Sequence, residues 1–283
     1  ELIFENTPLS ALVVWKYDSV TGEALEGAVF QVRYLGGTSG TGGTIIGTYK
    51  TSANGSFTVT GLEAGTYIVE EVDSPNGHVI DTAPQTAYIS GKEQDVAQLY
   101  FGNSPKGSLL IKKIDSETHE PLSDVEFMVT TADGTVVGDA NGKFVTDSAG
   151  TILIEGIDPG TTLVVKETRA KTGYELDDTP QTATIKAGQT VTLEFRNAPQ
   201  GCLLITKVDS VTRKPLSGVQ FQIAGCNGCE YPAGTYTTDA NGQIKLSHIP
   251  SGCYSITETK AAAGYLLNGT AQTVKVESGS CKE

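Results

Sequence analysis

Apolar and polar residues alternate along this chain in short runs, which are separated by glycine, proline and Asn-Gly. The segment Ala28–Tyr34 shows the alternation clearly. A period of two is typical of a β-strand that buries one face, whereas a buried helix needs an apolar period of about 3.6 residues. We find no stretch that keeps the helical period long enough for a buried helix. The pattern therefore predicts an all-β protein.

The predicted strands fall into three successive groups. The first group is Leu12–Tyr17, Ala28–Tyr34, Ser56–Thr60, Thr66–Val72 and Asp95–Gly102. The second is Leu109–Ile114, Val125–Thr130, Thr151–Ile154, Leu163–Thr168, Thr182–Ile185 and Val191–Arg196. The third is Leu203–Val208, Val219–Ile223, Gln243–Leu246, Tyr254–Glu258 and Gln272–Val276. The glycine- and threonine-rich stretch Leu35–Gly47 is predicted to be a loop. About seven short strands in roughly 95 residues indicate an Ig-like β-sandwich for each group.

A repeated junction sets the limits of the units. At this junction one unit ends with the motif Phe-x-Asn-x-Pro. The next unit begins with an apolar strand that carries the motif Lys-x-Asp. The ends are Phe4–Pro8, Phe101–Pro105 and Phe195–Pro199, and the Lys-x-Asp strands carry Lys16, Lys113 and Lys207. Asn6 to Asn103 is 97 residues and Asn103 to Asn197 is 94, a normal size for one sandwich. We therefore predict a tandem array: the last strand of a preceding repeat (1–8) and three repeats (9–105, 106–199 and 200–283).

The third unit ends early when its sequence is aligned with that of the second unit. Its last residues, Gly279–Glu283, align with Gly188–Thr192 of the second unit, where Leu193–Asn197 follows. A matching piece, Leu2–Asn6, stands at the other end of the sequence. We therefore expect the chain to be cut within a strand, so that the third sandwich lacks its final strand.

Charge and composition exclude some classes of function. The formal net charge is -13, which argues against nucleic-acid binding because that function rewards basic patches. We read this charge as a solvated acidic surface that keeps an elongated protein soluble. No apolar run approaches the roughly 20 residues that cross a bilayer, so no membrane insertion is expected.

Three residue types keep their register in the units and could carry chemistry. They are the lysines Lys16, Lys113 and Lys207, the asparagines Asn6, Asn103 and Asn197, and the glutamates Glu71, Glu167 and Glu258. By strand parity, Lys113 and Lys207 are predicted to point into the core. A buried lysine has a lowered pKa and becomes a neutral nucleophile, and a buried carboxyl beside it can move the proton. Attack on an asparagine amide would release ammonia and leave an isopeptide crosslink.

A plainer interpretation is that these are surface lysines, strand-end asparagines and glutamates at the rim of the sheets. For a single triplet that interpretation would be preferred. Because the triplet recurs in register, we favour the crosslink.

With these motifs in order, the units resemble the B-type repeats of Gram-positive collagen adhesins (Cna B-type) and the SpaA-type pilin domains. The resemblance covers nearly the whole chain. It implies internal Lys–Asn isopeptide bonds assisted by a glutamate, namely Lys16–Asn103 with Glu71 and Lys113–Asn197 with Glu167. Two departures stand out. The first unit has Glu70-Glu71 and His78 where the family has Thr and Tyr, and the second has Leu163 where the other units have Tyr.

The third unit has Lys207 and Glu258 but no asparagine in register, because Asn268 comes too early. One hypothesis is that Leu2–Asn6 of another molecule adds the missing strand, with a Lys207–Asn6 crosslink. Such head-to-tail pairing would build a fibre. The other is that the end of the sequence is only a boundary and the unit forms no such pair. The residues leave both open.

The five cysteines all belong to the third unit: Cys202, Cys226, Cys229, Cys253 and Cys281. A CxxC pair can bind zinc, but zinc folds commonly use two such pairs, so disulfides with one thiol left over are favoured in an extracellular protein. Cys202–Cys281 is the first expected pair, because in this topology both residues begin parallel neighbouring strands. Cys226 pairs with either Cys229 or Cys253. No metal site and no cofactor are predicted.

The predicted function is mechanical: a stalk or pilin-like segment of a Gram-positive surface protein, held together by self-formed crosslinks. It is not an enzyme beyond this single turnover. Its expected partners are the neighbouring repeats of the same protein. Its expected location is extracellular, attached to the cell wall through regions outside this chain. The alternative is an adhesin module that binds a host protein or glycan, with Leu35–Gly47 and the cysteine-rich end of the third unit as candidate surfaces.

Overall fold

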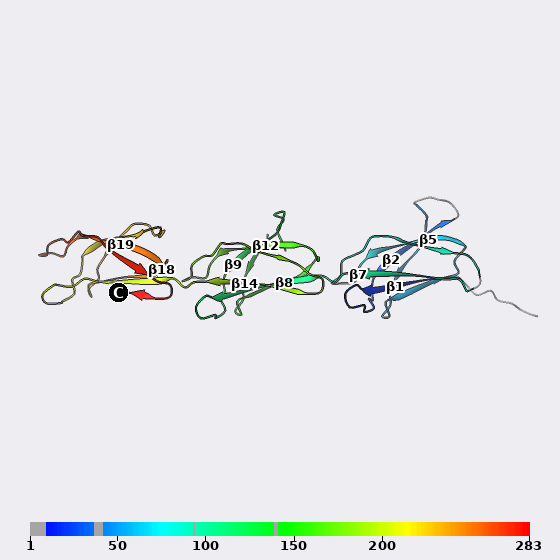
Figure 1. Ribbon diagram of the computed structural model, residues 1–283, viewed down its shortest axis with the longest axis horizontal. Helices are drawn as coiled ribbons and strands as arrows, with labels where there is room; N and C mark the ends of the chain where they lie inside the picture. Colours follow the sequence, from blue (N-terminus) through cyan, green and yellow to red (C-terminus); the bar gives the residue numbers. More distant parts are fainter. Residues whose placement is uncertain (1–9, 37–41, 93, 139–140) are drawn as a thin grey trace, which may run out of the picture. The chain divides into compact units, whose positions relative to one another are not determined.

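The computed structural model describes residues 10–36, 42–92, 94–138 and 141–283. The described residues form strands, turns and irregular segments, with no helix among them. The strands make six sheets that pair into three β-sandwiches, so the predicted all-β array of three domains is confirmed (Figure 1). Each domain is described separately below.

The described residues of the first domain form seven strands. They are β1 (Ala11–Asp18), β2 (Val29–Gly36), β3 (Thr44–Lys50), β4 (Ser56–Thr60), β5 (Gly65–Asp73), β6 (Gln85–Ile89) and β7 (Val96–Asn103). One sheet has the order β4-β1-β7 and the other the order β3-β2-β5-β6. Strand β1 pairs antiparallel with β4 and parallel with β7. The first strand of the domain therefore lies next to the last.

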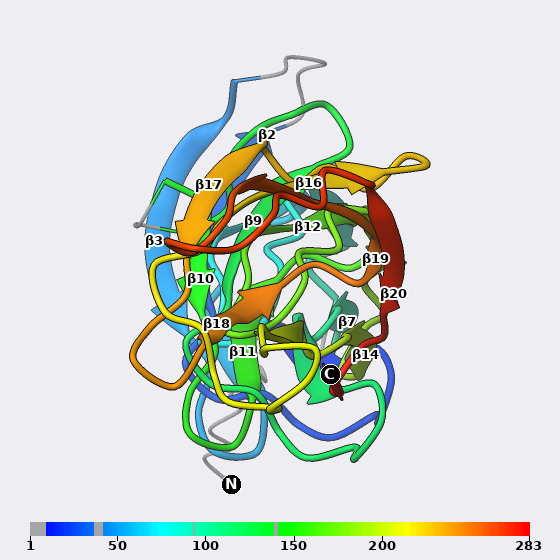
Figure 2. The same cartoon turned by 90° about the vertical axis from the view of Figure 1, so that its left-hand side faces the viewer.

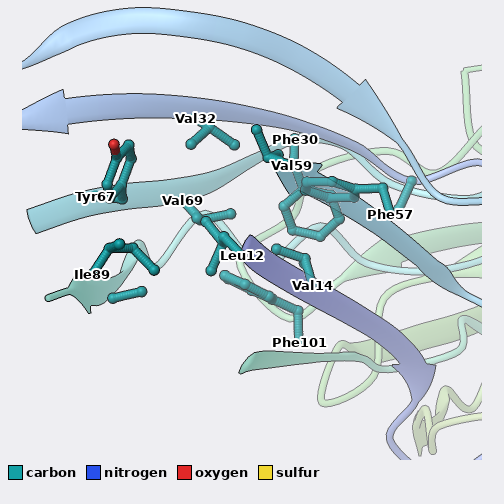
Figure 3. Close-up of a cluster of buried hydrophobic side chains, with 12 residues drawn as sticks. Leu12, Val14, Phe30, Val32, Phe57, Val59, Tyr67, Val69, Ile89 and Phe101 are labelled. Atoms are coloured by element: carbon teal, nitrogen blue, oxygen red, sulfur yellow. The ribbon is translucent and has the colours of Figure 1, made fainter. Parts of the chain in front are cut away.

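The inner faces of these two sheets make the core of the first domain. The alternating pattern of β1, β2 and β5 places every second side chain inward, as a half-buried strand requires. Figure 3 shows the resulting cluster, in which the ring of Phe30 packs between those of Phe57 and Phe101. The aliphatic members of the cluster include Leu12, Val14, Val32, Val59, Val69 and Ile89.

The second domain repeats the arrangement, with another seven strands in the part that the structure describes. They are β8 (Gly107–Asp115), β9 (Glu126–Thr131), β10 (Lys143–Val145), β11 (Thr151–Ile157), β12 (Thr162–Arg169), β13 (Gln181–Thr184) and β14 (Thr190–Asn197). The sheet orders are β11-β8-β14 and β10-β9-β12-β13. They match the first domain strand for strand.

The third domain also has seven strands. They are β15 (Gly201–Thr206), β16 (Gln220–Cys226), β17 (Gly234–Thr237), β18 (Gln243–Ile249), β19 (Gly252–Lys260), β20 (Gln272–Val276) and β21 (Cys281–Lys282). The sheets are β18-β15-β21 and β17-β16-β19-β20. Figure 2 shows β16 and β17 lying above β18. Strand β21 has two residues where β7 and β14 have eight each. The described domain therefore lacks most of its final strand, as predicted.

Part of the predicted loop Leu35–Gly47 is wrong. Leu35 and Gly36 end strand β2, and Thr44–Gly47 belongs to strand β3, which pairs antiparallel with β2. Residues 37–41 lie outside the described residues. The reason is composition: Thr44, Ile45 and Ile46 favour strands, but the glycines on both sides gave a loop signal. The prediction also missed β6, β10 and β17. The last two contain three and four residues, too few for a clear alternation.

Candidate functional site: buried lysine, glutamate and asparagine between the sheets

The site of the first domain lies between its two sheets, where β1 and β7 run side by side. In their parallel register Lys16 lies opposite Phe101, and Asn103 lies two residues further along β7 on the same face. The facing sheet contributes Glu71, which lies opposite Phe30 on β5 and β2. Strand parity sends all of these side chains inward.

Polar contacts join the three side chains into one cluster. Nζ of Lys16 donates to Oε2 of Glu71 at 2.9 Å and also to Oδ1 of Asn103. Nδ2 of Asn103 donates to the other carboxylate oxygen, Oε1 of Glu71, at 2.8 Å. All three residues are 1% exposed. The glutamate therefore faces the amine with one oxygen and the amide nitrogen with the other.

The surroundings of Lys16 disfavour its charged form. Burial lowers its pKa from 10.5, against the opposing effects of Glu71 and Asp81. Two aromatic rings enclose the amine, with Nζ 5.7 Å from the ring centroid of Phe30 and 5.9 Å from that of Phe101. Because the face of an aromatic ring attracts a cation, the lowering of the Lys16 pKa comes from burial and not from these rings. The cluster can therefore supply a neutral amine beside a carboxamide.

The second domain builds the same cluster. Nζ of Lys113 donates to Oε2 of Glu167 at 2.7 Å and to Oδ1 of Asn197, and Nδ2 of Asn197 donates to Oε1 of Glu167 at 2.6 Å. Burial lowers the pKa of Lys113 as well. Its Nζ lies 6.0 Å from the ring of Phe127. Two domains with different sequences therefore reach the same arrangement.

The third domain has two members of the cluster. Nζ of Lys207 donates to Oε2 of Glu258 at 2.9 Å. The lysine side chain is 27% exposed, whereas Lys16 and Lys113 are buried completely. The alternation of the strand predicted that Lys207 would be buried, and this burial is incomplete. The reason is that β21 is short and leaves this part of β15 uncovered. Asn6 and the rest of Leu2–Asn6 lie outside the described residues, so the Lys207–Asn6 pairing stays a prediction.

Sequence reasoning missed two acidic residues near the clusters, Asp81 and Asp177. The backbone N–H of Asp81 donates to Oε2 of Glu71 at 3.1 Å, and its charge opposes the lowering of the Lys16 pKa. Asp177 acts in the same way on Lys113. Each stands three residues after the His or Tyr that follows the glutamate strand, and this spacing is the signal that could have revealed them.

The aspartate of each Lys-x-Asp motif has a structural position. Oδ1 of Asp18 accepts hydrogen bonds from the backbone N–H groups of the following turn. Its Oδ2 lies 3.0 Å from Nε2 of His78, whereas the corresponding Asp115 and Asp209 accept from tyrosine hydroxyls at 2.9 Å and 2.6 Å. The departure at His78 thus preserves a contact between this loop and the end of the first strand.

The cysteines form two disulfides in the third domain, Cys202–Cys281 and Cys226–Cys253. The first pair was predicted, and the second settles the alternative left open for Cys226. Cys229 is the free thiol of this domain, all of whose residues are described. No group of three or more potential metal ligands occurs among the described residues. Within the same residues we find no helix that could cross a bilayer.

Comparison with protein families gives three matches. The family described as "SpaA: Prealbumin-like fold domain" matches residues 10–104, 107–199 and 201–283. These ranges take in each pair of sheets and each lysine–glutamate pair described above. A search of curated proteins finds no match.

Several solved structures are similar to this chain. The Bacillus anthracis TIE protein is 26% identical with a TM-score of 0.46, and the match covers 97% of this chain and 49% of that one. This chain thus spans about half the length of that protein. A streptococcal ancillary pilin is 18% identical (TM-score 0.44), with 95% of each chain covered. BcpA, the major pilin subunit of Bacillus cereus, is 20% identical (TM-score 0.40), again with 95% of each chain covered.

Proposed function

This chain belongs to the SpaA family of prealbumin-like fold domains, and from that premise we propose that it is a pilin-type structural segment strengthened by its own crosslinks. In this proposal Lys16 bonds to Asn103, and Lys113 bonds to Asn197. Glu71 and Glu167 assist the two reactions. The observation that carries the proposal is the burial of a lysine, a carboxylate and an amide in hydrogen-bonding contact in both domains.

The chemistry follows from these contacts. Glu71 takes a proton from the Lys16 ammonium, and the neutral Nζ attacks Cγ of Asn103. The bond from Cγ to Nδ2 then breaks while Glu71 directs a proton to the departing nitrogen, which it already contacts. Of the three ammonium protons, one stays on the new amide, one leaves with ammonia and one passes to solvent. The carboxylate is regenerated, so the reaction happens once and consumes no cofactor.

A bond between the first and the last strand suits a load-bearing role. It closes a loop between residues 87 apart in the first domain and 84 apart in the second. By the chain-entropy argument used for disulfides, each such loop stabilises its domain by about 4.6 kcal/mol. Force applied along the chain cannot then separate the parallel pair β1 and β7 by shear. We place such a segment outside a Gram-positive cell, anchored through regions beyond this chain.

The mass of the intact, reduced and denatured protein tests the proposal. Each crosslink removes one ammonia, about 17 Da, so we expect a deficit of about 34 Da for the two domains. Fragment spectra should locate the deficits at Lys16–Asn103 and Lys113–Asn197. A mass equal to the sequence formula would overturn the crosslinks.

The alternative of an adhesin that binds a host protein or glycan stays a prediction. One of its two candidate surfaces, Leu35–Gly47, is partly edge strand β3 and partly outside the described residues. The other, at the cysteine-rich end of the third domain, carries the two disulfides. A screen of matrix proteins and glycans should show saturable binding if the adhesin alternative holds, and none for a stalk.

A further inference from the structure

Three aromatic side chains lie on the outer face of the sheet β4-β1-β7 in the first domain. The core and the buried cluster use the inward residues of β1, which leaves Trp15 and Tyr17 on the opposite face. In the parallel pair with β7, Trp15 lies opposite Tyr100, and Tyr17 lies opposite Gly102. A Cβ added at Gly102 would lie 3.0 Å from two ring atoms of Tyr17, so the glycine lets this ring rest against the backbone. Tyr17 is 37% exposed and Tyr100 is 55% exposed, so both rings can reach a ligand.

A glutamine on the same face holds two of the rings in place. Nε1 of Trp15 donates to Oε1 of Gln98 at 3.1 Å, and the hydroxyl of Tyr100 donates to the same oxygen at 2.9 Å. An indole N–H can only donate, so it fixes which atom of the amide faces it. The two N–H groups of the exposed Gln98 amide have no hydrogen-bond partner among the described residues. They are therefore available to an acceptor from outside the chain.

The face is uncharged, unlike its counterpart in the second domain. There, Lys112, Glu194 and Arg196 stand at the positions of the tryptophan, the exposed tyrosine of β7 and the glycine. In the first domain the outward residues of β1, β4 and β7 include no charged side chain, although the chain has a net charge of -13. Because a ligand charge would lose hydration here without gaining a partner, the face favours a neutral ligand.

The size of the face favours a small ligand. Three strands about 4.8 Å apart, with at most eight residues each, offer less than about 400 Å². A stable protein interface buries about 800 Å² on each partner, so this face alone is too small for a second copy or another protein. Trp15 and Tyr100 lie on neighbouring strands, and Tyr17 lies about 7 Å further along β1. Two or three linked sugar rings would cover that distance.

We propose that this face binds a neutral oligosaccharide of two or three pyranose rings. One side of a pyranose carries C–H groups, which stack on the negatively polarised faces of Trp15, Tyr17 and Tyr100. The amide N–H groups of Gln98 donate to a hydroxyl or acetamide oxygen of the sugar. This binding goes beyond the structural role proposed above and is independent of the crosslinks. The face is also separate from the two candidate surfaces of the adhesin alternative.

The fluorescence of Trp15 tests the proposal directly, because it is the only tryptophan of the sequence. The full chain is titrated with cellotriose and with the trimer of N-acetylglucosamine, which are both neutral, and with sialyllactose as the charged comparison. We expect a saturable change with at least one neutral trimer, and an affinity at least ten-fold weaker for sialyllactose. No saturable change with either neutral trimer, or equal affinity for the charged sugar, would overturn the proposal.

Variants that keep the tryptophan assign the binding to this face. Tyr100→Ala and Gln98→Leu should each weaken binding at least ten-fold. Tyr88→Ala is the matched control and should bind as the unmodified chain does, because Tyr88 is 68% exposed but lies on β6 of the other sheet. Calorimetry of each variant shows whether the first domain is still folded at the temperature of the titration. Equal binding by all three folded variants would overturn the proposal.

Other occupants of the face would give different results. A second copy would produce a dimer in size-exclusion chromatography that Trp15→Ala dissociates. A protein partner would change the Trp15 fluorescence in the screen of matrix proteins while neither neutral trimer does. Either result would overturn the proposal. The chain carrying Trp15→Ala and Tyr100→Ala is the reference for the screen of the adhesin alternative, because it lacks this face. These variants should keep the mass deficit of the crosslinks, so the two proposals can fail separately.

Discussion

Nδ2 of Asn103 lies 2.8 Å from Oε1 of Glu71, on the opposite side of the carboxylate from the Lys16 amine. The nitrogen that leaves in the proposed reaction and the nitrogen that attacks therefore contact different oxygens of one group. A single carboxylate can move protons between them without a rotation of its side chain. The second domain shows the same division at Glu167.

This arrangement predicts that Glu71→Gln stops the first crosslink and leaves the second. A glutamine cannot take the proton from Lys16, so the mass deficit should fall from about 34 Da to about 17 Da. Glu70→Gln is a matched control, because Glu70 is the neighbouring residue and lies on the outer face of β5, where it pairs with Arg33. The control should keep the full deficit. An unchanged deficit in Glu71→Gln would show that the carboxylate is not needed.

The crosslink should also govern the stability of the second domain. Lys113→Met removes the bond and with it about 4.6 kcal/mol, besides leaving Glu167 without its cation. For a domain of this size, such a loss lowers the unfolding temperature by roughly 20 °C or more. Scanning calorimetry measures the shift, and trypsin digestion should show earlier cleavage. The adjacent exposed lysine provides the control: Lys112→Met should change neither. Equal behaviour of the two variants would argue against the bond.

Much of this site could be predicted from the sequence, because strand parity is a local property. Period-two alternation around Lys113 identifies its inward face, and the repeated Phe-x-Asn identifies the strand beside it. The role of the phenylalanine could not be derived in this way. It depends on Phe30 or Phe127, which belong to the facing sheet.

The features that sequence reasoning missed depend on contacts between distant segments. Asp81 reaches Glu71 from an irregular segment, where no periodicity predicts the path of the backbone. The exposure of Lys207 depends on how far β21 extends beside β15. The alternation of side chains within β15 gives no information about that length. Edge strand β3 was hidden by its glycines, because its pairing with β2 decides its conformation.

The turn after β15 predicts a pH dependence. The hydroxyl of Tyr265, followed by the backbone N–H groups of the turn, lowers the pKa of Asp209 from 3.8 to about 2. Since the folded value is the lower one, the ionised carboxylate stabilises the fold above pH 3.8, and this contribution is lost as the pH falls from 3.8 to about 2. Tyr265→Phe should raise the pKa of Asp209 towards 3.8, as measured by carboxyl NMR titration. Tyr236→Phe alters a tyrosine of the same domain that bonds to Tyr231 instead, so it should leave that titration unchanged.

Reduction should destabilise the third domain alone. Its disulfides join residues 79 and 27 positions apart, which corresponds to about 4.5 and about 3.5 kcal/mol in the chain-entropy model. Their sum is comparable to the whole stability of a typical domain, about 5–15 kcal/mol. We therefore expect dithiothreitol to remove or strongly lower one calorimetric transition. The first two domains contain no cysteine, so their transitions should stay in place.

Thiol counting supplies the control for this prediction. Alkylation of the denatured, unreduced chain should modify one cysteine, Cys229, and alkylation after reduction should modify all five. Cys229→Ser should keep the transition of the third domain and its sensitivity to reductant, because this thiol belongs to neither disulfide. Cys202→Ser with Cys281→Ser should reproduce part of the effect without reductant. If reduction left every transition unchanged, the two disulfides would contribute nothing to the stability of the fold, and the chain-entropy argument would fail for this domain.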